Sequence, residues 1–472
     1  MQVTQTASAP AAGAAAPKEV NHPFLSLIIM VVVALVATYL VPAGQFERVV
    51  VDGRTLVDPA SFAFIESNPA GIAAFFESFY KGFVQASGII GLVLFVGGAF
   101  GVLKYMGVLD AAVYGLTEKT AGKGLWVIAP VVMLAIYLNT TFTGMRELDV
   151  IFITLMIPIC IKLGYDAMTA LGIVLLSSCA GFAAALANPF FTGIAHDIAE
   201  LPLYSGMWYR AIIGIFMLLT GMAYVLRYAQ KVKADPSQSL VANSGVTYDV
   251  AEQVKALNSR EKAAGLTFVA IMSFMIYGTL TMGFGFNQMS GCFFAAAFIS
   301  GLVGGLSLNK ICDYWTRGCS DVLVAALIIL FARAIMTIME DAMVVDTIIH
   351  WLSQFLIGGN ELMSAVAMYV SQAIINLFIP SGSGQAVITM PIIVPLADMG
   401  GVTRQVAALA SQLGDGISNY IYPTNGGLLA VLALAKIPYG TWVKFFLPLF
   451  ALWTVVALVA VVIGQMIGLG PF

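Results

Sequence analysis

The sequence predicts an all-α polytopic membrane protein, built as an inverted repeat with about nine transmembrane spans, two re-entrant hairpins and two broken helices. Of its 472 residues, 60% are hydrophobic and 10% are charged, and the mean hydropathy is +0.92. Soluble domains have about 45–50% apolar and about 25% charged residues, so this composition is typical of a protein embedded in a lipid bilayer. Two apolar regions are interrupted by residues that end helices, at matching positions in the two halves of the chain.

One interruption lies within Asn376–Pro395, where the sequence Pro380-Ser381-Gly382-Ser383-Gly384 cannot continue a helix. Proline lacks the backbone donor, and glycine destabilises the helical backbone. The apolar segments on either side, 362–377 and 386–396, are short for a span of about 20 residues. Irregular backbone at membrane depth occurs only where it is buried in protein or lines a wet cavity. We therefore expect a re-entrant hairpin over 362–397 with its tip offered to a ligand.

The other interruption, Asn139–Gly144, divides the apolar region 125–163. Asn376 and Pro395 follow Asn139 and Pro158 by 237 residues each, and other pairs keep nearly the same offset. A constant offset across apolar sequence indicates an internal duplication. Paired repeats with interrupted segments at corresponding places point to a transporter binding site.

The remaining elements follow from composition. Residues 1–23 are rich in alanine and are expected to form a disordered tail, and the polar residues 231–261 a cytoplasmic linker. Lysine and arginine gather on the side of this linker, which puts the N-terminus in the cytoplasm. Thirteen full spans would place every loop on the same side of the membrane as nine spans with two hairpins do. The polar, helix-ending residues at the tips favour the hairpins. The other predicted units are the first inverted repeat 24–230, with hairpin 125–163 and broken helix 166–200, a linking span 262–289, and the second repeat 290–472, with hairpin 362–397 and broken helix 402–436.

Four motifs carry a resemblance to a known family: NTTFTGMRELDVIFI, LANPFFTG, FIPSGSGQAVITMPIIVPLAD and QLGDGISNYIYPTNGG. They resemble the YfcC-like branch of the C4-dicarboxylate anaerobic carrier family, within the ion transporter superfamily. The resemblance implies secondary transport across the bacterial inner membrane by a homodimer, with an elevator motion of a transport domain. It also implies a small-molecule substrate and a coupling ion at the two tips and the two helix breaks. Members of this branch are assigned as basic amino-acid antiporters or as dicarboxylate carriers.

The candidate site residues come from these tips and breaks. Their alternative role is to cap half-helices and to hydrogen-bond the broken backbone, and Arg146 and Glu147 alternatively form a local ion pair. Asp149, Asp197 and Asp415 are the candidates for binding Na⁺ or a proton, because charged groups within a membrane are costly and usually functional. The predicted substrate-binding residues are Asn139, Thr140, Thr141, Thr143, Gly144, Glu147, Asn188, Asn376, Ser381, Gly382, Ser383, Gly384, Gln385, Asp415, Asn419, Thr424 and Asn425.

Four other polar residues are assigned structural roles. His196 is expected to be a hydrogen-bonded packing residue rather than a proton relay. Arg333, Glu340 and Asp341 are expected to form a structural or interfacial cluster at the outer end of their span.

Acidic groups outnumber basic groups near the tips, which favours a cationic substrate. We therefore expect a secondary transporter, antiporter or symporter, of a small and basic amino acid. A dicarboxylate carrier of the same fold is the alternative, followed by a channel and by an intramembrane hydrolase with Ser383 as nucleophile. We expect no enzyme activity, no cofactor apart from Na⁺ or H⁺ as coupling ion, no metal cluster and, with a net charge of −3, no nucleic-acid partner.

Overall fold

The computed structural model describes residues 23–51, 54–57, 61–108, 111, 124–144, 146, 148–242, 246, 257–282, 284–354 and 360–470. The predicted tail, apart from Pro23, much of the predicted linker and the candidate residue Glu147 lie outside the described residues. The described chain is mostly helical, and seven helices are long and apolar enough to cross a membrane, or eight if the bent pair α12–α13 counts as one span. A polytopic membrane protein is thus confirmed, whereas nine spans with two re-entrant hairpins stay a prediction.

The all-α class is wrong in one region, because the polar segment after the first helix contains two small antiparallel sheets. Strands β1 (Gly44–Gln45) and β4 (Ala63–Phe64) form one, and β2 (Arg48–Val51) and β3 (Arg54–Val57) form the other. The sequence around β2, Val-Val-Val followed by Asp-Gly, is a β-branched run ending in a hairpin-type dipeptide, and it favours strands. We overlooked this signal among the charged residues.

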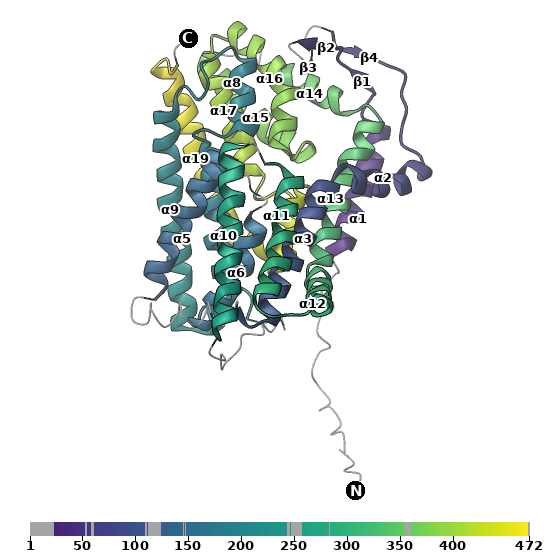
Figure 1. The fold of residues 1–472 in the computed structure, drawn as a ribbon. Coiled ribbons are helices and arrows are strands. Elements are labelled where there is room, and N and C mark those ends of the chain that lie inside the picture. The colour runs from purple at the N-terminus through teal and green to yellow at the C-terminus, as the bar shows by residue number, and fades with distance from the viewer. Residues whose placement is uncertain are drawn as a thin grey trace, which may run out of the picture.

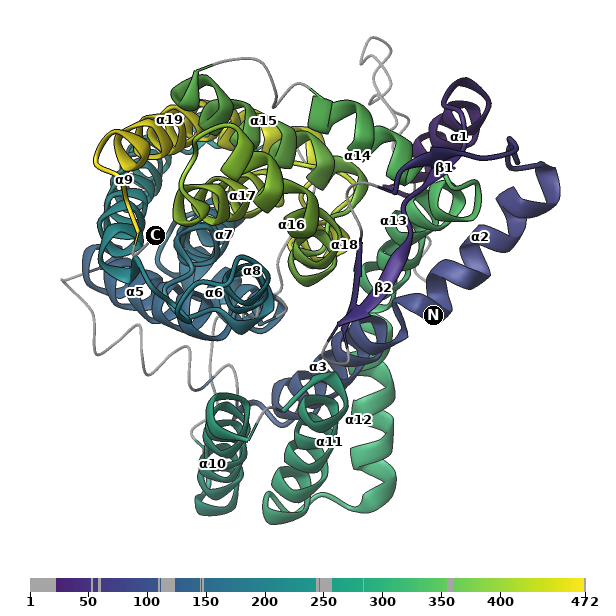
Figure 2. The same ribbon diagram turned by 90° about the horizontal axis from the view of Figure 1, so that it is seen from above.

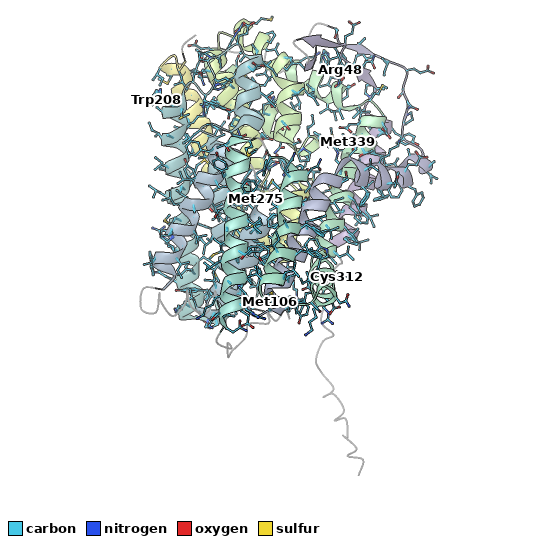
Figure 3. The ribbon with its side chains drawn as sticks, in the orientation of Figure 1. Arg48, Met106, Trp208, Met275, Cys312 and Met339 are labelled. Carbon is cyan, nitrogen blue, oxygen red and sulfur yellow. The ribbon has the colours of Figure 1, made fainter. Side chains whose placement is uncertain are left out.

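Hydrogen bonds to Asp346 hold this strand region against the helices. Arg48 Nη2 donates to Asp346 Oδ1 (3.0 Å), and the backbone N–H of Phe46 donates to Asp346 Oδ2 (3.0 Å). The hydrogen bond from Arg48 to Asp346 raises the pKa of the guanidinium. Figure 3 shows Arg48 at the end of the molecule opposite to Met106 and Cys312.

The helices fall into two bodies, which Figure 2 shows side by side. In the first, which we call the scaffold, α13 packs against α1, α2 and α3. Close packing in the scaffold depends on glycine: a Cβ at Gly318 of α12 would lie 2.3 Å from the carbonyl oxygen of Gly97 in α3. The scaffold helices are α1 (Pro23–Leu40), α2 (Ile72–Gln85), α3 (Ser87–Tyr105), α10 (Ser259–Thr281), α11 (Phe286–Val303), α12 (Leu308–Asp321), α13 (Leu323–Asp341) and α14 (Val345–Gln354).

We call the second body the transport body; it is built around α7, every residue of which is buried. Helix α7 packs against α5, α6, α9 and α17 (Figure 2). Helices α9 and α19 lie on the side of the molecule away from α1 and α2 (Figure 1). The first arms of both hairpins, α5 and α15, are long enough to cross a membrane, so they are longer than the sequence suggested. Its elements are α5 (Leu125–Thr143), α6 (Asp149–Lys162), α7 (Ala167–Ala184), η1 (Pro189–Gly193), α8 (Ile194–Ile198), α9 (Met207–Ala234), η2 (Pro236–Gln238), α15 (Glu361–Phe378), α16 (Gly382–Met399), α17 (Arg404–Ser418), α18 (Gly426–Leu434) and α19 (Tyr439–Met466).

Helix breaks separate α7 from η1 and α17 from α18, and buried side chains satisfy the carbonyl groups that these breaks leave free. At the first break, Arg210 of α9 donates to the carbonyl oxygen of Leu186 (3.1 Å). At the second break, the indole of Trp442 donates to the carbonyl oxygen of Tyr420 (2.8 Å). Backbone groups without such partners would be costly away from water, so these side chains make the irregular segments tolerable inside the bundle.

Candidate functional site

A cavity of about 540 Å³ lies where the transport body faces the scaffold. Both hairpin tips, the second helix break, α13 and the junction of α2 with α3 contribute to its wall. The sequence therefore located segments that the fold brings together. Of the predicted residues, those that line the cavity are Gly144, Asp149, Ser381, Gly382, Ser383, Asn419, Thr424 and Asn425.

The first tip is fixed against the first helix break. Gly144 ends α5 with φ +70°, a conformation that favours glycine, and a Cβ there would lie 2.2 Å from Asn188 Oδ1. Thr141 Oγ1 accepts a hydrogen bond from the backbone N–H of Leu186 (3.0 Å), and Thr140 Oγ1 donates to the Ile136 carbonyl (2.9 Å). Both threonines are fully buried, so their hydroxyls hold the tip rather than line the cavity.

The second tip exposes a helix N-terminus to the cavity. Ser381 caps α16, because its Oγ accepts a hydrogen bond from the N–H of Gly384 (3.3 Å). Gln385 is fully buried and donates to Gln372 Oε1 (2.8 Å), so it joins the two arms of the hairpin. Gly384 and Gln385 do not line the cavity. The N-terminus of an 18-residue helix favours a negative group, which makes this tip suited to a carboxylate.

The second break holds a chain of amides that ends on a carboxylate. Asn425 caps α18 through the N–H of Leu428 (2.9 Å) and donates to Asn419 Oδ1 (2.6 Å). Asn419 in turn donates to Asp415 Oδ1 (3.0 Å). Asn376, from the hairpin arm α15, donates to the Asp415 carbonyl (3.0 Å). These contacts fix the position of the Asp415 side chain.

One oxygen of this carboxylate stays open toward the second tip. Asp415 is fully buried, and its Oδ2 accepts no hydrogen bond from the described part of the chain. A Cβ built on Gly382 would lie 3.4 Å from this oxygen, and Gly382 lines the cavity. A buried, unpaired carboxylate oxygen is costly, so this position favours a cation or a hydrogen-bond donor.

Arg146 and Asp149, which follow the first tip, add two charges to the cavity wall. The guanidinium carbon of Arg146 lies 4.4 Å from the ring centroid of Phe182 and 6.0 Å from that of Tyr420. Asp149 is 3% exposed and lies in the first turn of α6, where the helix end favours a carboxylate.

Several predicted residues lie apart from the cavity. Asp197 is exposed on α8 and is not part of the wall. Asn139 is half-buried in α5, and neither it nor Asn188 nor Asn376 lines the cavity, although Asn188 contacts the first tip. For Thr143, the structure describes the backbone but not the side chain.

The neighbouring His196 is held in a fixed hydrogen-bond pattern. Its Nε2 faces Arg210 Nη1 (3.4 Å) and Gln405 Nε2 (3.3 Å), both of which are donors, and its Nδ1 faces the Pro202 carbonyl (3.3 Å). Nε2 therefore accepts and Nδ1 donates, the neutral form that the packing role predicts.

Sequence reasoning missed the contribution of the scaffold. Arg333 of α13 lines the cavity, whereas we predicted it in a structural cluster at the outer end of its span. Gln85, at the end of α2, lies in the same wall. An arginine in the middle of an apolar span was itself a sufficient signal, because such charges are usually functional.

Comparison with known proteins identifies the family of this chain. The family model of the C4-dicarboxylate anaerobic carriers matches residues 21–466. The chain belongs to this family. It is 30% identical, over 94% of its length and 96% of the relative, to YfcC of Escherichia coli (strain K12), which is proposed to be a basic amino acid antiporter. It is also 30% identical to an uncharacterized protein of Haemophilus influenzae, over 84% of this chain and 79% of that protein.

Two solved structures match most of the chain at low TM-scores and low sequence identity. The Alcanivorax borkumensis YdaH transporter matches with a TM-score of 0.42 and 17% identity, over 96% of this chain and 100% of that one. The Neisseria gonorrhoeae protein MtrF, from a class of antimetabolite efflux pumps, matches with a TM-score of 0.41 and 18% identity, over 96% and 98%. Because the family is one of carriers and the described chain has seven candidate spans, this protein is a multi-pass inner-membrane transporter. The alternative of an intramembrane hydrolase is therefore wrong.

Proposed function

We propose that this carrier is an elevator-type secondary antiporter that exchanges small basic amino acids of the arginine or ornithine type. The observation that carries the proposal is the set of charges on the transport body. Among the described side chains of the transport body, Arg146 and Asp149 line the cavity, and the buried carboxylate of Asp415 lies next to Gly382 in its wall. A basic amino acid carries the complementary set, one carboxylate and two cationic groups.

Each charged group of the substrate then has a partner of opposite sign. The α-carboxylate pairs with Arg146 and with the N-terminus of α16 at the second tip, because a guanidinium and a helix N-terminus both favour anions. The α-ammonium and the side-chain cation pair with Asp415 Oδ2 and Asp149. The buried Oδ2 of Asp415, which accepts no hydrogen bond from the described part of the chain, thereby gains a partner.

A dicarboxylate carrier is the second candidate, supported by the name of the family and by the two guanidiniums of Arg146 and Arg333 in one cavity wall. A dicarboxylate, however, would bring a second negative charge toward Asp149 and Asp415. This repulsion has to be removed by protonation or by Na⁺, so a dicarboxylate carrier of this geometry needs a coupling cation.

The rest of the transport cycle is proposed on the same basis. The transport body moves against the scaffold, and the repeats 24–230 and 290–472 exchange roles between the two states. The N-terminus is cytoplasmic, the working unit is a homodimer and no resident cofactor is needed. If a coupling ion takes part, it is Na⁺ or H⁺ and binds at Asp415.

The test is counterflow with the reconstituted protein. Proteoliposomes are loaded with arginine or ornithine, and in parallel with succinate or fumarate, and uptake of the labelled compound is followed with and without a Na⁺ or pH gradient. We expect saturable exchange of the basic amino acids without a gradient. Exchange of the dicarboxylates alone would overturn the proposal, and flux that neither saturates nor shows counterflow would indicate a channel.

Arg146→Gln sharpens this test. The variant should raise the KM for arginine by about tenfold or more, the size of one charge-assisted hydrogen bond, with a smaller effect on agmatine, which lacks the carboxylate. Equal effects on the two compounds would contradict the pairing of Arg146 with the α-carboxylate.

A further inference from the structure

One aromatic ring lies next to both hairpin tips. Phe182, in the last turn of α7, is 2% exposed and lines the cavity. The guanidinium carbon of Arg146, which follows the first tip, lies over this ring at 4.4 Å from its centroid. At the second tip, a Cβ built on Gly382 would lie 3.0 Å from Phe182 Cζ. The ring is thus next to the two groups that the proposed function assigns to the substrate carboxylate, Arg146 and the N-terminus of α16.

Buried hydrogen bonds fix the backbone that carries this ring. Every residue of α7 is buried, and the Phe182 carbonyl at its C-terminal end accepts a hydrogen bond from Gln412 Nε2 (2.9 Å) of α17. Gln412 Oε1 accepts in turn from Thr192 Oγ1 (3.0 Å) of η1, and both of these side chains are buried. A fully satisfied buried network is rigid, so Phe182 offers a fixed surface to the charged side chain that lies over it.

An aromatic ring can orient an arginine without occupying its hydrogen-bond donors. The negative face of the ring attracts the cation, whereas a carboxylate of the protein in the same place would bind the N–H fork itself. An arginine oriented in this way can still bind a substrate carboxylate through two parallel hydrogen bonds. The ring of Tyr420, 6.0 Å from the guanidinium carbon of Arg146, lies at the outer limit of about 6 Å for such a contact, so Phe182 supplies most of it.

We propose that Phe182 is a positioning residue, which holds the guanidinium of Arg146 beside the second tip so that both bind the carboxylate of the substrate. This inference rests on the proposed function and adds to it the group that orients the anion-binding side chain. The effect of Phe182 on the substrate passes through Arg146. It therefore depends on the presence of Arg146 and on the carboxylate of the transported compound.

The test is a double-mutant cycle of Phe182→Leu and Arg146→Gln, read as the KM for arginine in counterflow. Phe182→Leu alone should raise this KM by about tenfold, within the range of one desolvated cation–π contact, and should raise the KM for agmatine less. In the Arg146→Gln background, Phe182→Leu should change the KM for arginine little. Mono- and trifluorinated phenylalanine at position 182 keep the shape of the ring and weaken its negative face, so the KM should rise with the number of fluorine atoms. These fluorinated proteins also decide the question if Phe182→Leu does not fold.

Phe191→Leu is the matched control. Phe191 is fully buried and its Cδ2 lies 3.7 Å from the same Cβ position at Gly382, but it does not line the cavity. Its substitution should lower the unfolding temperature, and any effect on KM should be equal with and without Arg146. The same equality for Phe182→Leu, or a KM that does not respond to fluorination, would overturn the positioning role. Exchange of succinate in place of arginine by the wild type would overturn the proposed function alone, and the same cycle measured with succinate then decides the role of Phe182.

Discussion

The first hairpin, α5–α6, brings charged side chains to the cavity, whereas the second, α15–α16, brings a helix N-terminus and hydroxyl groups. Arg146 and Asp149 follow the first tip, while Pro380 to Ser383 form the second. At the first tip itself, Thr140 and Thr141 are buried, and Thr141 accepts a hydrogen bond from Leu186 at the neighbouring helix break.

The two tips occupy matching positions in the sequence but have different roles in the structure. At the first tip, the threonines hold the backbone in place and the residues after the tip face the substrate. At the second, the tip backbone faces the substrate, and its charged partner, Asp415, comes from the neighbouring helix break. Substitutions at equivalent positions should therefore have different consequences, and four experiments test this.

The largest effect is expected for Asp415→Asn. The change removes the charge of the one site carboxylate with an open oxygen at the second tip, so counterflow of arginine should fall by about tenfold to hundredfold, the range of a hydrogen bond to a charged group. The amide can still accept from Asn419, so thermal unfolding in detergent should change little. Near-normal uptake would remove Asp415 from the site.

The tip glycines give the sharpest comparison. Gly144→Ala should destabilise the protein by about 1–2 kcal/mol from its left-handed backbone alone, and the approach of Cβ to Asn188 adds to this cost. In Gly382→Ala, Cβ would lie in a helical conformation 3.0 Å from Phe182 and 3.4 Å from Asp415 Oδ2, so substrate affinity should fall more than stability. The measurements are thermal unfolding and KM for both variants. Similar losses of stability and of affinity in the two variants would mean that the two tips are equivalent.

The hydroxyl groups of the two tips should also differ, the first affecting stability and the second affecting substrate affinity. Thr141→Val leaves the N–H of Leu186 without its partner and should cost about 1–3 kcal/mol of stability, measured as a fall in the unfolding temperature. Ser383→Ala, at the cavity wall, should leave this temperature unchanged and alter KM by only a few fold. A stability loss confined to the Ser383 variant would reverse the assignment.

The smallest effect is expected outside the cavity, where Arg404 connects the end of the second hairpin to α8. It donates to Asp398 Oδ2 and to Glu200 Oε2, both at 2.8 Å, and the two acids are exposed. Exposed ion pairs contribute about 0–1 kcal/mol, so Arg404→Gln should shift unfolding slightly and leave arginine counterflow intact. A large loss of counterflow would mean that this outer contact takes part in the motion.

The sequence by itself determined the approximate positions of the two tips and the two breaks. Pro189 and Pro380 cannot sit within a regular hydrogen-bond ladder, Asn425 and Ser381 are N-cap residues, and Gly144 tolerates a positive φ. These are local properties of the backbone, so two tips and two breaks could be predicted without knowledge of the fold. The strands β1 to β4 escaped because their signal lies in a short β-branched run among charges.

Only the tertiary structure decided which polar groups face the cavity. Thr141, Gln385 and Ser383 are all polar side chains at or next to a predicted tip. Thr141 and Gln385, however, form hydrogen bonds with residues 45 and 13 positions away, so these polar groups do not face the cavity. Arg333 lies on a helix with no local link to either tip, and it reaches the cavity because α13 packs against α18. Side-chain partnership depends on which helices pack together, and that is a property of the whole chain.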